Sequence, residues 1–186
     1  PAEAVKPLAS GLPPVDDPAF ADTDTGRLLA ALGRPLTAQA VDACTPWRFA
    51  APVAPDAAAA REGRSLRLVD LVAFHHGALA RAAGAPLIVE GVGGVMSPAT
   101  SDALNLDWIA ALGCPVLLVA GSYVGAISHA LTSLAVLSHR RIAVAAVIVS
   151  ESEGSAASPA ETAAAISTWS GRPVGWLPRA RTVGTG

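Results

Sequence analysis

Apolar runs and amphipathic stretches alternate along most of the chain, and this order predicts strands separated by helices. Continuous apolar runs, which are typical of strands buried on both faces of a parallel sheet, occupy residues 86–89, 115–120 and 142–149. Apolar residues recur every three or four positions, the spacing of helices with one buried face, at 70–83, 106–112, 126–139 and 159–170. The pattern therefore predicts an α/β fold with a parallel sheet and helices on both faces, in three layers.

The N-terminal third carries weaker signals. A short strand is expected at residues 4–7, followed by a proline-rich loop. A helix is predicted to begin at Thr23 or Asp24, because either side chain can cap its first turn. The segment 35–63 is rich in alanine and proline, so we expect irregular structure there with one short helix around 57–60.

The last predicted helix has a clear start signal. Ser158 stands three residues before Glu161, with Pro159 at the first helical position, which is the pattern of a capping box. A short strand is expected to follow at 173–176, and the tail after Arg181 is expected to be disordered.

Composition and charge narrow the class of protein. The 186 residues are 52% hydrophobic, enough for one sizeable core, so we expect a single domain over residues 1–186. The net charge of −2 does not suit nucleic acid or an anionic membrane surface as the main partner, and a small-molecule ligand fits better. No apolar run approaches the ~20 residues of a membrane span. Cys44 and Cys114 lie far apart without Cys-x-x-Cys or Cys/His ligand spacing, which indicates a reducing compartment and no zinc site, with a single disulfide as the alternative. The expected location is the cytoplasm.

Chemistry is predicted to centre on the stretch Pro86–Pro98, PLIVEGVGGVMSP. A buried strand there delivers Glu90 into a glycine-rich turn, at the edge where parallel α/β sheets bind ligands. The carboxylate can hold Mg²⁺, while the glycines allow phosphate oxygens to approach backbone N–H groups. A strand-end acid that only caps its turn fits the same pattern, so both interpretations stay open.

Lys6 and Asp24 are further candidates, and each has an ordinary alternative. Lys6 is the only lysine and is expected to emerge from a strand end, although a lone lysine is more often a solvated surface group. Asp24 can give Mg²⁺ a second carboxylate, since this ion takes one or two carboxylates in phosphoryl-transfer sites. It can equally well cap its helix.

Four motifs follow one another along the chain. They are Lys6–Gly11 (KPLASG), Thr23–Asp24 (TD), Val89–Gly94 (VEGVGG), and the strand Pro115–Val119 (PVLLV) with the loop-helix Gly125–Ala130 (GAISHA). In this order they resemble the dethiobiotin synthetase family of biotin biosynthesis, with its Lys-Pro-[Val/Leu]-x-[Ser/Thr]-Gly, Ser-Asp, Val-Glu-Gly-Ala-Gly-Gly and Gly-x-Ile-Asn-His segments. The resemblance covers roughly residues 4–178 and is weak only in the alanine-rich segment.

The resemblance implies an ATP-dependent ring closure on a P-loop-type, Rossmann-like fold. 7,8-Diaminopelargonate would be carbamated by CO2, and the carbamate would be phosphorylated by ATP with Mg²⁺. The second amine would then displace phosphate to give dethiobiotin. The resemblance also implies a homodimer.

Position by position, the resemblance implies roles for individual residues. Lys6 would be catalytic, neutralising the carbamate or its mixed anhydride, while Asp24 and Glu90 would bind Mg²⁺ and the nucleotide. The substrate-binding positions would be Ser10, Gly91, Val92 and Gly93, with Gly125, Ala126, Ile127 and Ser128 receiving the distal carboxylate across the dimer interface. The positions framing the adenine would be Ser150, Glu151, Pro178, Arg179 and Ala180.

The sequence departs from the family pattern in three places. No Gly-x-x-x-x-Gly-Lys-[Ser/Thr] phosphate loop occurs, since Lys6 is the only lysine, and the first residue is Pro1 rather than methionine. We therefore expect an N-terminally shortened chain that does not hold ATP phosphates or turn over, with processing and natural loss as alternatives. Ser128 and Ser150 each replace a family asparagine, which puts the carboxylate contacts and the nucleotide preference in question.

Two other classes remain as alternatives. A non-catalytic ligand-binding or dimer-forming relative would keep the sheet and substrate pocket without the nucleotide machinery. A cobyrinate amidating enzyme or a partitioning ATPase of the wider P-loop group would not need the Lys6 and Gly125–Ser128 segments. Translating the region upstream of Pro1 would distinguish the ligase from the non-catalytic relative.

Overall fold

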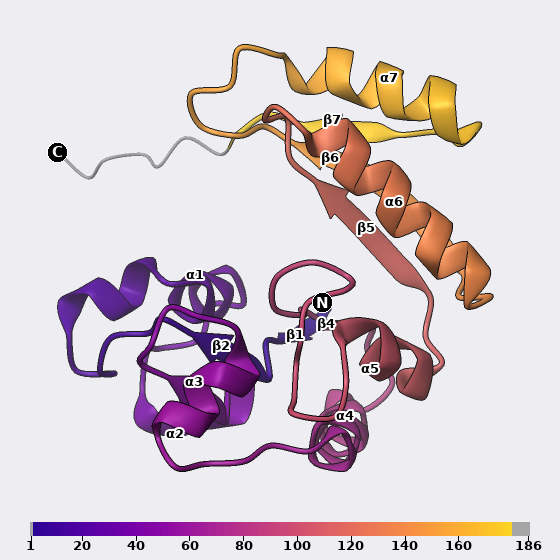
Figure 1. Ribbon diagram of the computed structural model, residues 1–186. Coiled ribbons are helices and arrows are strands. Elements are labelled where there is room, and N and C mark those ends of the chain that lie inside the picture. Colours follow the sequence, from indigo (N-terminus) through magenta and orange to yellow (C-terminus); the bar gives the residue numbers. More distant parts are fainter. Residues whose placement is uncertain (1, 180–186) are drawn as a thin grey trace, which may run out of the picture. The chain divides into compact units, whose positions relative to one another are not determined.

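The structure is a computed structural model that describes residues 2–179. The chain forms two compact units, one ending at Leu112 and one beginning at Gly113 (Figure 1). In each unit every pair of strands is parallel and helices connect the strands, which confirms the predicted α/β class. The single domain stays a prediction, and the tail after Arg181 lies outside the described residues.

The first unit contains two pairs of parallel strands. β1 (Glu3–Val5) pairs with β4 (Leu87–Val89), and β2 (Leu8–Ser10) pairs with β3 (Trp47–Phe49). The helices of this unit are η1 (Pro18–Asp22), α1 (Asp24–Ala31), α2 (Ala38–Cys44), α3 (Pro55–Arg61), α4 (Leu68–Ala82) and α5 (Asn105–Leu112).

Two buried apolar clusters hold the first unit together. The larger one includes Leu8 of β2, Phe49 of β3, Leu71 of α4 and Trp108 of α5. The smaller one surrounds Phe20 and packs α1 and α2 against η1. Each large apolar side chain contributes roughly 1.5–3 kcal/mol when it is fully buried. The clusters thus fix the strands and helices whose ends carry the polar residues described below.

Predicted caps set two helix boundaries. Thr23 accepts a hydrogen bond from the Gly26 N–H and so begins α1. In α7 (Pro159–Ser170), Ser158 Oγ accepts from the Glu161 N–H while the Glu161 carboxylate accepts from the Ser158 N–H, which confirms the capping box. Hydrogen bonds from Ser158 also hold the pKa of the Glu161 carboxyl below its ordinary value.

The alanine-rich segment 35–63 is more regular than its composition predicts. It forms α2, β3 and α3, where we expected irregular chain and one short helix. Thr37 caps α2 by accepting from the Ala40 N–H, and Pro55 occupies the first turn of α3. The short helix expected around 57–60 is confirmed by α3. The expectation of irregular chain was wrong because β3 pairs with β2, and such long-range pairing overrides a weak local pattern.

The second unit is a three-stranded parallel sheet. Its order is β5 (Val116–Ala120), β6 (Val144–Ser150) and β7 (Gly175–Leu177). α6 (Ala126–His139) packs on β5, while α7 packs on β6 and β7 and touches α6, so both helices cover one face (Figure 1). These elements agree with the predicted ones to within a few residues.

Exposure alternates along β5, where the continuous apolar run predicts burial of both faces. Leu118 and Val147 are buried, whereas Leu117 and Val119 are 52% and 58% exposed. Successive strand side chains point to opposite faces, and α6 and α7 cover only one of them. The apolar run therefore reports the strand correctly but not the burial of each residue.

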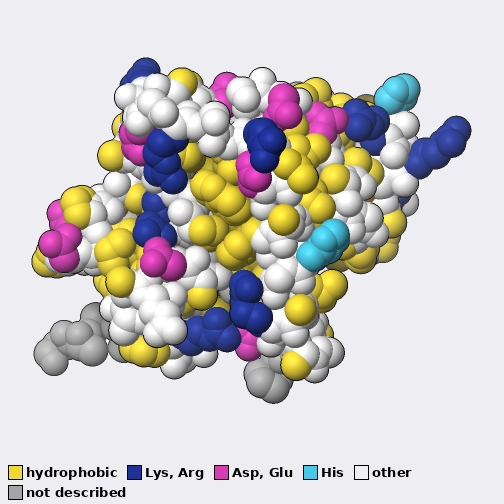
Figure 2. Space-filling model, turned by 90° about the horizontal axis from the view of Figure 1, so that it is seen from below, with side chains coloured by type: hydrophobic (Ala, Val, Ile, Leu, Met, Phe, Trp, Pro, Cys, Tyr) yellow, Lys and Arg dark blue, Asp and Glu magenta, His cyan; other side chains and the backbone are white. Residues whose placement is uncertain are grey.

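Charged side chains are interspersed on the face shown in Figure 2. Lys and Arg side chains lie among Asp and Glu side chains there, and hydrophobic side chains make up much of the surface. Within residues 2–179, every helix is too short or too polar to cross a membrane.

Candidate active site

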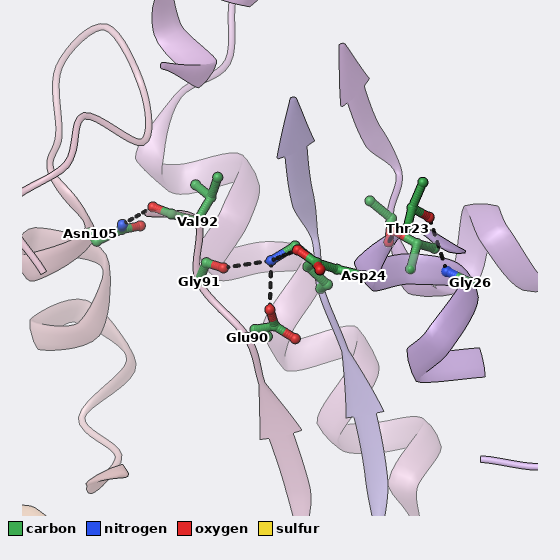
Figure 3. A network of polar contacts seen from close by, with 10 residues as sticks. Thr23, Asp24, Gly26, Glu90, Gly91, Val92 and Asn105 are labelled. Atoms are coloured by element: carbon green, nitrogen blue, oxygen red, sulfur yellow. Dashed lines mark hydrogen bonds and ion pairs between the residues drawn. The ribbon is translucent and has the colours of Figure 1, made fainter. Parts of the chain in front are cut away.

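Lys6 lies at the centre of a polar cluster in the first unit, and Figure 3 labels its partners Asp24, Glu90 and Gly91. Its Nζ atom lies 2.7 Å from Glu90 Oε1 and 3.3 Å from Asp24 Oδ2, and it donates to the Gly91 carbonyl oxygen at 3.0 Å. The lysine is 5% exposed, whereas the side chains of Asp24 and Glu90 are 67% and 48% exposed. A buried ammonium group therefore faces two carboxylates that solvent can reach.

Parallel pairing brings Lys6 and Glu90 together although 84 positions separate them in the sequence. β1 and β4 are in register, with Val5 opposite Val89, and the Glu90 N–H donates to the Val5 carbonyl at 2.9 Å. Because the carboxyl ends of parallel strands share one edge of a sheet, the residues that follow these strands meet there.

Asp24 reaches the same edge from the first turn of α1. Thr23 provides the side-chain cap of this helix, so the Asp24 carboxylate pairs with Lys6 instead. The helix dipole also favours a negative charge at this end. Gly26 lets the turn pass closely, since an added Cβ would lie 2.5 Å from the carbonyl oxygens of Phe20 and Ala21.

The other predicted substrate positions of this unit differ in their surroundings. Gly91–Gly93 form the turn beside Lys6 (Figure 3). Ser10 ends β2, and its hydroxyl donates to the Val53 carbonyl oxygen at 2.7 Å. The hydroxyl hydrogen of Ser10 is thus used within the protein, while its oxygen can still accept a hydrogen bond.

Asn105 is a residue of this site that the sequence did not indicate. Its side-chain amide donates to the Val92 carbonyl oxygen (Figure 3) and to the Gly94 carbonyl oxygen, both in the turn that follows Glu90. The sequence suggests only that Asp102 or Asn105 caps a helix. No local pattern reveals the contact, because the acceptors lie 13 and 11 positions earlier in an irregular turn.

In the second unit, the predicted carboxylate-binding positions lie at the start of α6. Gly125 has a φ of +97° and precedes the helix without a side-chain cap. Ala126 is buried, whereas Ile127 and Ser128 are exposed. The first turn of α6 lies at an accessible helix start, where an anion is favoured, and within it the Ala126 N–H donates to the Tyr123 carbonyl oxygen at 3.0 Å.

The predicted adenine positions gather at the edge of the same unit where β6 and β7 end. Ser150 lies opposite Leu177, and the Glu151 carboxylate accepts a hydrogen bond from the Arg179 N–H at 2.8 Å. Pro178 lies between these two contacts. Ala180 lies outside the described residues.

Two serines join the loops that follow β5 and β6. The Ser122 N–H donates to Ser152 Oγ, and the Ser152 N–H donates to Ser122 Oγ, both at 3.0 Å. Ser122 is 1% exposed, so these bonds are shielded from water. The serine pair therefore ties the loop that leads to α6 to the loop beside the adenine positions.

The carboxylates of Asp24 and Glu90 fit Mg²⁺ because this ion prefers oxygen ligands. Within residues 2–179 there is no group of three or more His, Cys, Asp and Glu residues that could hold a metal ion. In nucleotide sites Mg²⁺ takes one or two carboxylates and completes its shell with phosphate oxygens and water. Two cavities of the first unit, of about 140 and 320 Å³, are lined by residues other than Lys6, Asp24 and Glu90.

Known proteins resemble this chain along most of its length. The sequence model of a family described as an AAA domain matches residues 3–185. An ATP-dependent dethiobiotin synthetase BioD from Methylobacterium nodulans is 54% identical over 172 residues, which are 92% of this chain and 76% of that protein. Proteins of the same name from Acidiphilium cryptum and Caulobacter vibrioides are 48% and 50% identical, over 82% and 81% of this chain and 67% and 66% of their own lengths. The chain belongs to the family of ATP-dependent dethiobiotin synthetases.

Proposed function

We propose that this chain serves the ATP-dependent formation of dethiobiotin from 7,8-diaminopelargonate and CO2 in biotin biosynthesis, with ADP and phosphate as the other products. The observation that carries the proposal is the convergence of Lys6, Asp24 and Glu90 on one point (Figure 3). Identity to dethiobiotin synthetases favours this ligase over a non-catalytic relative.

The reaction creates negative charge that Lys6 is suited to neutralise. One substrate amine forms a C–N bond to CO2 and loses a proton, which leaves a carbamate anion. ATP transfers its γ-phosphoryl group to a carbamate oxygen, and the second amine then attacks the carbonyl carbon, expels phosphate and loses a proton. A buried ammonium interacts with such anions more strongly than one in bulk water, and its bond to the Gly91 carbonyl holds it in place.

Asp24 and Glu90 would hold Mg²⁺, which would supply positive charge to the nucleotide phosphates. Both carboxylates are accessible, and both already face a cation, the ammonium of Lys6. Their negative charge also holds the Lys6 ammonium in position until an anionic substrate arrives. The chain's own contribution is therefore positioning and charge stabilisation, which phosphoryl transfer mainly requires.

The second unit would bind the two ends of the ligands that do not react. Backbone N–H groups at Gly125–Ser128 would receive the distal carboxylate of the substrate across a homodimer interface. Ser150, Glu151, Pro178, Arg179 and Ala180 would frame the adenine. We place the enzyme in the cytoplasm.

Mass spectrometry of the product tests the proposal. Diaminopelargonate, ¹³C-bicarbonate and Mg-ATP are supplied, and labelled dethiobiotin is measured. The 186 residues contain no Gly-x-x-x-x-Gly-Lys-[Ser/Thr], so the chain is compared with any longer product of the same gene that carries such a loop. We expect diaminopelargonate binding by the chain and labelled dethiobiotin from the product with the loop; loss of both results would contradict the proposal.

A further inference from the structure

Asn105 makes an unusual use of its side chain. It is the first residue of α5 and is 4% exposed. Its Nδ2 group donates to the Val92 carbonyl and, at 2.9 Å, to the Gly94 carbonyl, so both hydrogens of one amide are used (Figure 3). Its Oδ1 atom is buried and has no hydrogen-bond partner among the described residues.

The chemistry of the two acceptors requires this orientation of the amide. A reversed side chain would place the Asn105 oxygen against two carbonyl oxygens, which repel it. Aspartate would do the same with a full negative charge, and alanine would leave both carbonyls without a donor. Among residues of this size, only asparagine supplies two hydrogens from one neutral group.

Holding these carbonyls also fixes the N–H groups of the turn. In a trans peptide the N–H points opposite to the preceding C=O, so the N–H of Gly93 points away from Asn105. Lys6 holds the neighbouring Gly91 carbonyl in the same way and thereby directs the Val92 N–H. Glycines fix little on their own, because they adopt many backbone conformations.

We propose that Asn105 is a positioning residue for the turn Glu90–Gly94. It holds this turn from the side of α5 while Lys6 holds it from the side of β1, so that the Glu90 carboxylate and the outward N–H groups keep one arrangement. This inference rests on the proposed function of the same site. It adds that Asn105, at the start of α5, fixes the conformation of the turn that carries Glu90.

The test compares variants at two positions in the first turn of α5. Asn105→Ala and Asn105→Asp remove the donors, whereas Asp107→Asn, the matched control, weakens a cap in which the Asp107 carboxylate accepts from the Leu104 N–H at 3.0 Å. Calorimetry measures the affinity of the full chain for diaminopelargonate. We expect the affinity for diaminopelargonate to fall ~10–100-fold in the Asn105 variants, as it does when a residue that holds the binding groups in place by hydrogen bonds is replaced. The control should change it less than about threefold.

Hydrogen exchange measured by NMR keeps this test independent of ligand. The N–H groups of Gly94 and Ser97 are bonded within the turn, to Ser97 Oγ and the Gly94 carbonyl. In the Asn105 variants their exchange should be at least ~5-fold faster, and in Asp107→Asn unchanged.

Three outcomes distinguish a failure of the proposed role of Asn105 from a failure of the proposed function. Equal effects of the Asn105 variants and the control on exchange would overturn the inference, because Asn105 would then act only as a helix residue. If the parent chain does not bind diaminopelargonate, the proposed function fails, and exchange alone decides the role of Asn105. If Asn105→Ala does not fold, Asn105→Asp, which keeps the same shape, decides it.

Discussion

Replacing Lys6 with methionine should remove function and leave the first unit folded. The Lys6 side chain is 6% exposed, so its apolar stem lies inside the protein and only its ammonium reaches the polar groups. Methionine keeps an unbranched stem of similar length without the charge. Alanine removes the stem as well, so the two variants separate the effect of charge from that of packing.

The structure gives a size for each effect. Asp24 and Glu90 are largely exposed, so each ion pair contributes about 0–1 kcal/mol, and the bond to the Gly91 carbonyl contributes about 1.5–3 kcal/mol. Burying the ammonium costs several kcal/mol, which offsets most of this, so Lys6→Met should lie within about 1 kcal/mol of the parent protein. Lys6→Ala also loses three buried methylene groups at about 0.8 kcal/mol each and should be less stable than Lys6→Met by roughly 2–3 kcal/mol.

Urea unfolding followed by tryptophan fluorescence measures this difference. Trp47 and Trp108 belong to the first unit, so they report on the fold around Lys6. Trp169 and Trp176 of the second unit are 77% and 50% exposed and can be replaced by phenylalanine in the reference protein. If Lys6→Met were as unstable as Lys6→Ala, the ammonium itself would hold the unit together, and the reasoning above would be refuted.

Three further predictions concern stability. Gly26→Ala should lower the free energy of unfolding by at least about 2 kcal/mol, because its Cβ would lie 2.5 Å from two carbonyl oxygens. The control Gly77→Ala, whose Cβ meets only an arginine tip at 3.3 Å, should raise the free energy of unfolding by about 0.5–1 kcal/mol, and equal urea midpoints of the two variants would contradict this. Burial, and then the neighbouring His76, lowers the pKa of His75 from 6.5, so the unfolded chain protonates first and stability should fall as pH drops through 6.5. His75→Gln should flatten this dependence of stability on pH, and an unchanged profile in the variant would contradict the prediction. Ser152→Ala leaves the buried Ser122 N–H without its acceptor and should lower the stability of the second unit by about 1–3 kcal/mol in thermal melting. Ser138→Ala, at an exposed position, should lower it by less than about 0.5 kcal/mol, and equal losses would contradict the role of the serine pair.

The sequence predicts the part of the site that depends on parallel strands. The apolar run before Glu90 marks a strand, and Lys6 is expected to emerge from the end of another strand, so both residues are expected beyond the carboxyl ends of the sheet's strands. The structure places them 2.7 Å apart. For Asp24 the sequence leaves two roles open, because either it or Thr23 can cap α1. The cap is provided by Thr23, which leaves Asp24 to pair with Lys6.

The sequence does not predict features that depend on contacts between distant segments. β3 forms because residues 47–49 pair with β2, a contact that no local pattern contains. Asn105 reads as a possible helix cap, and its donation to the glycine-rich turn depends on where α5 packs. Exposure along β5 also escapes prediction, because Leu117 and Leu118 are alike in sequence and differ only in which face the helices cover.

The formation of ¹³C-labelled dethiobiotin is the most direct test of the proposed ligase reaction and of the role of Lys6 in it. The assay uses the full product of the gene, as the parent protein and as Lys6→Met, after urea unfolding has shown that both proteins are folded. We predict labelled dethiobiotin from the parent protein and at least about a 100-fold lower rate from Lys6→Met, since an electrostatic contact to the reacting group is lost. No labelled product from the folded parent protein, or an undiminished rate in Lys6→Met, would contradict it.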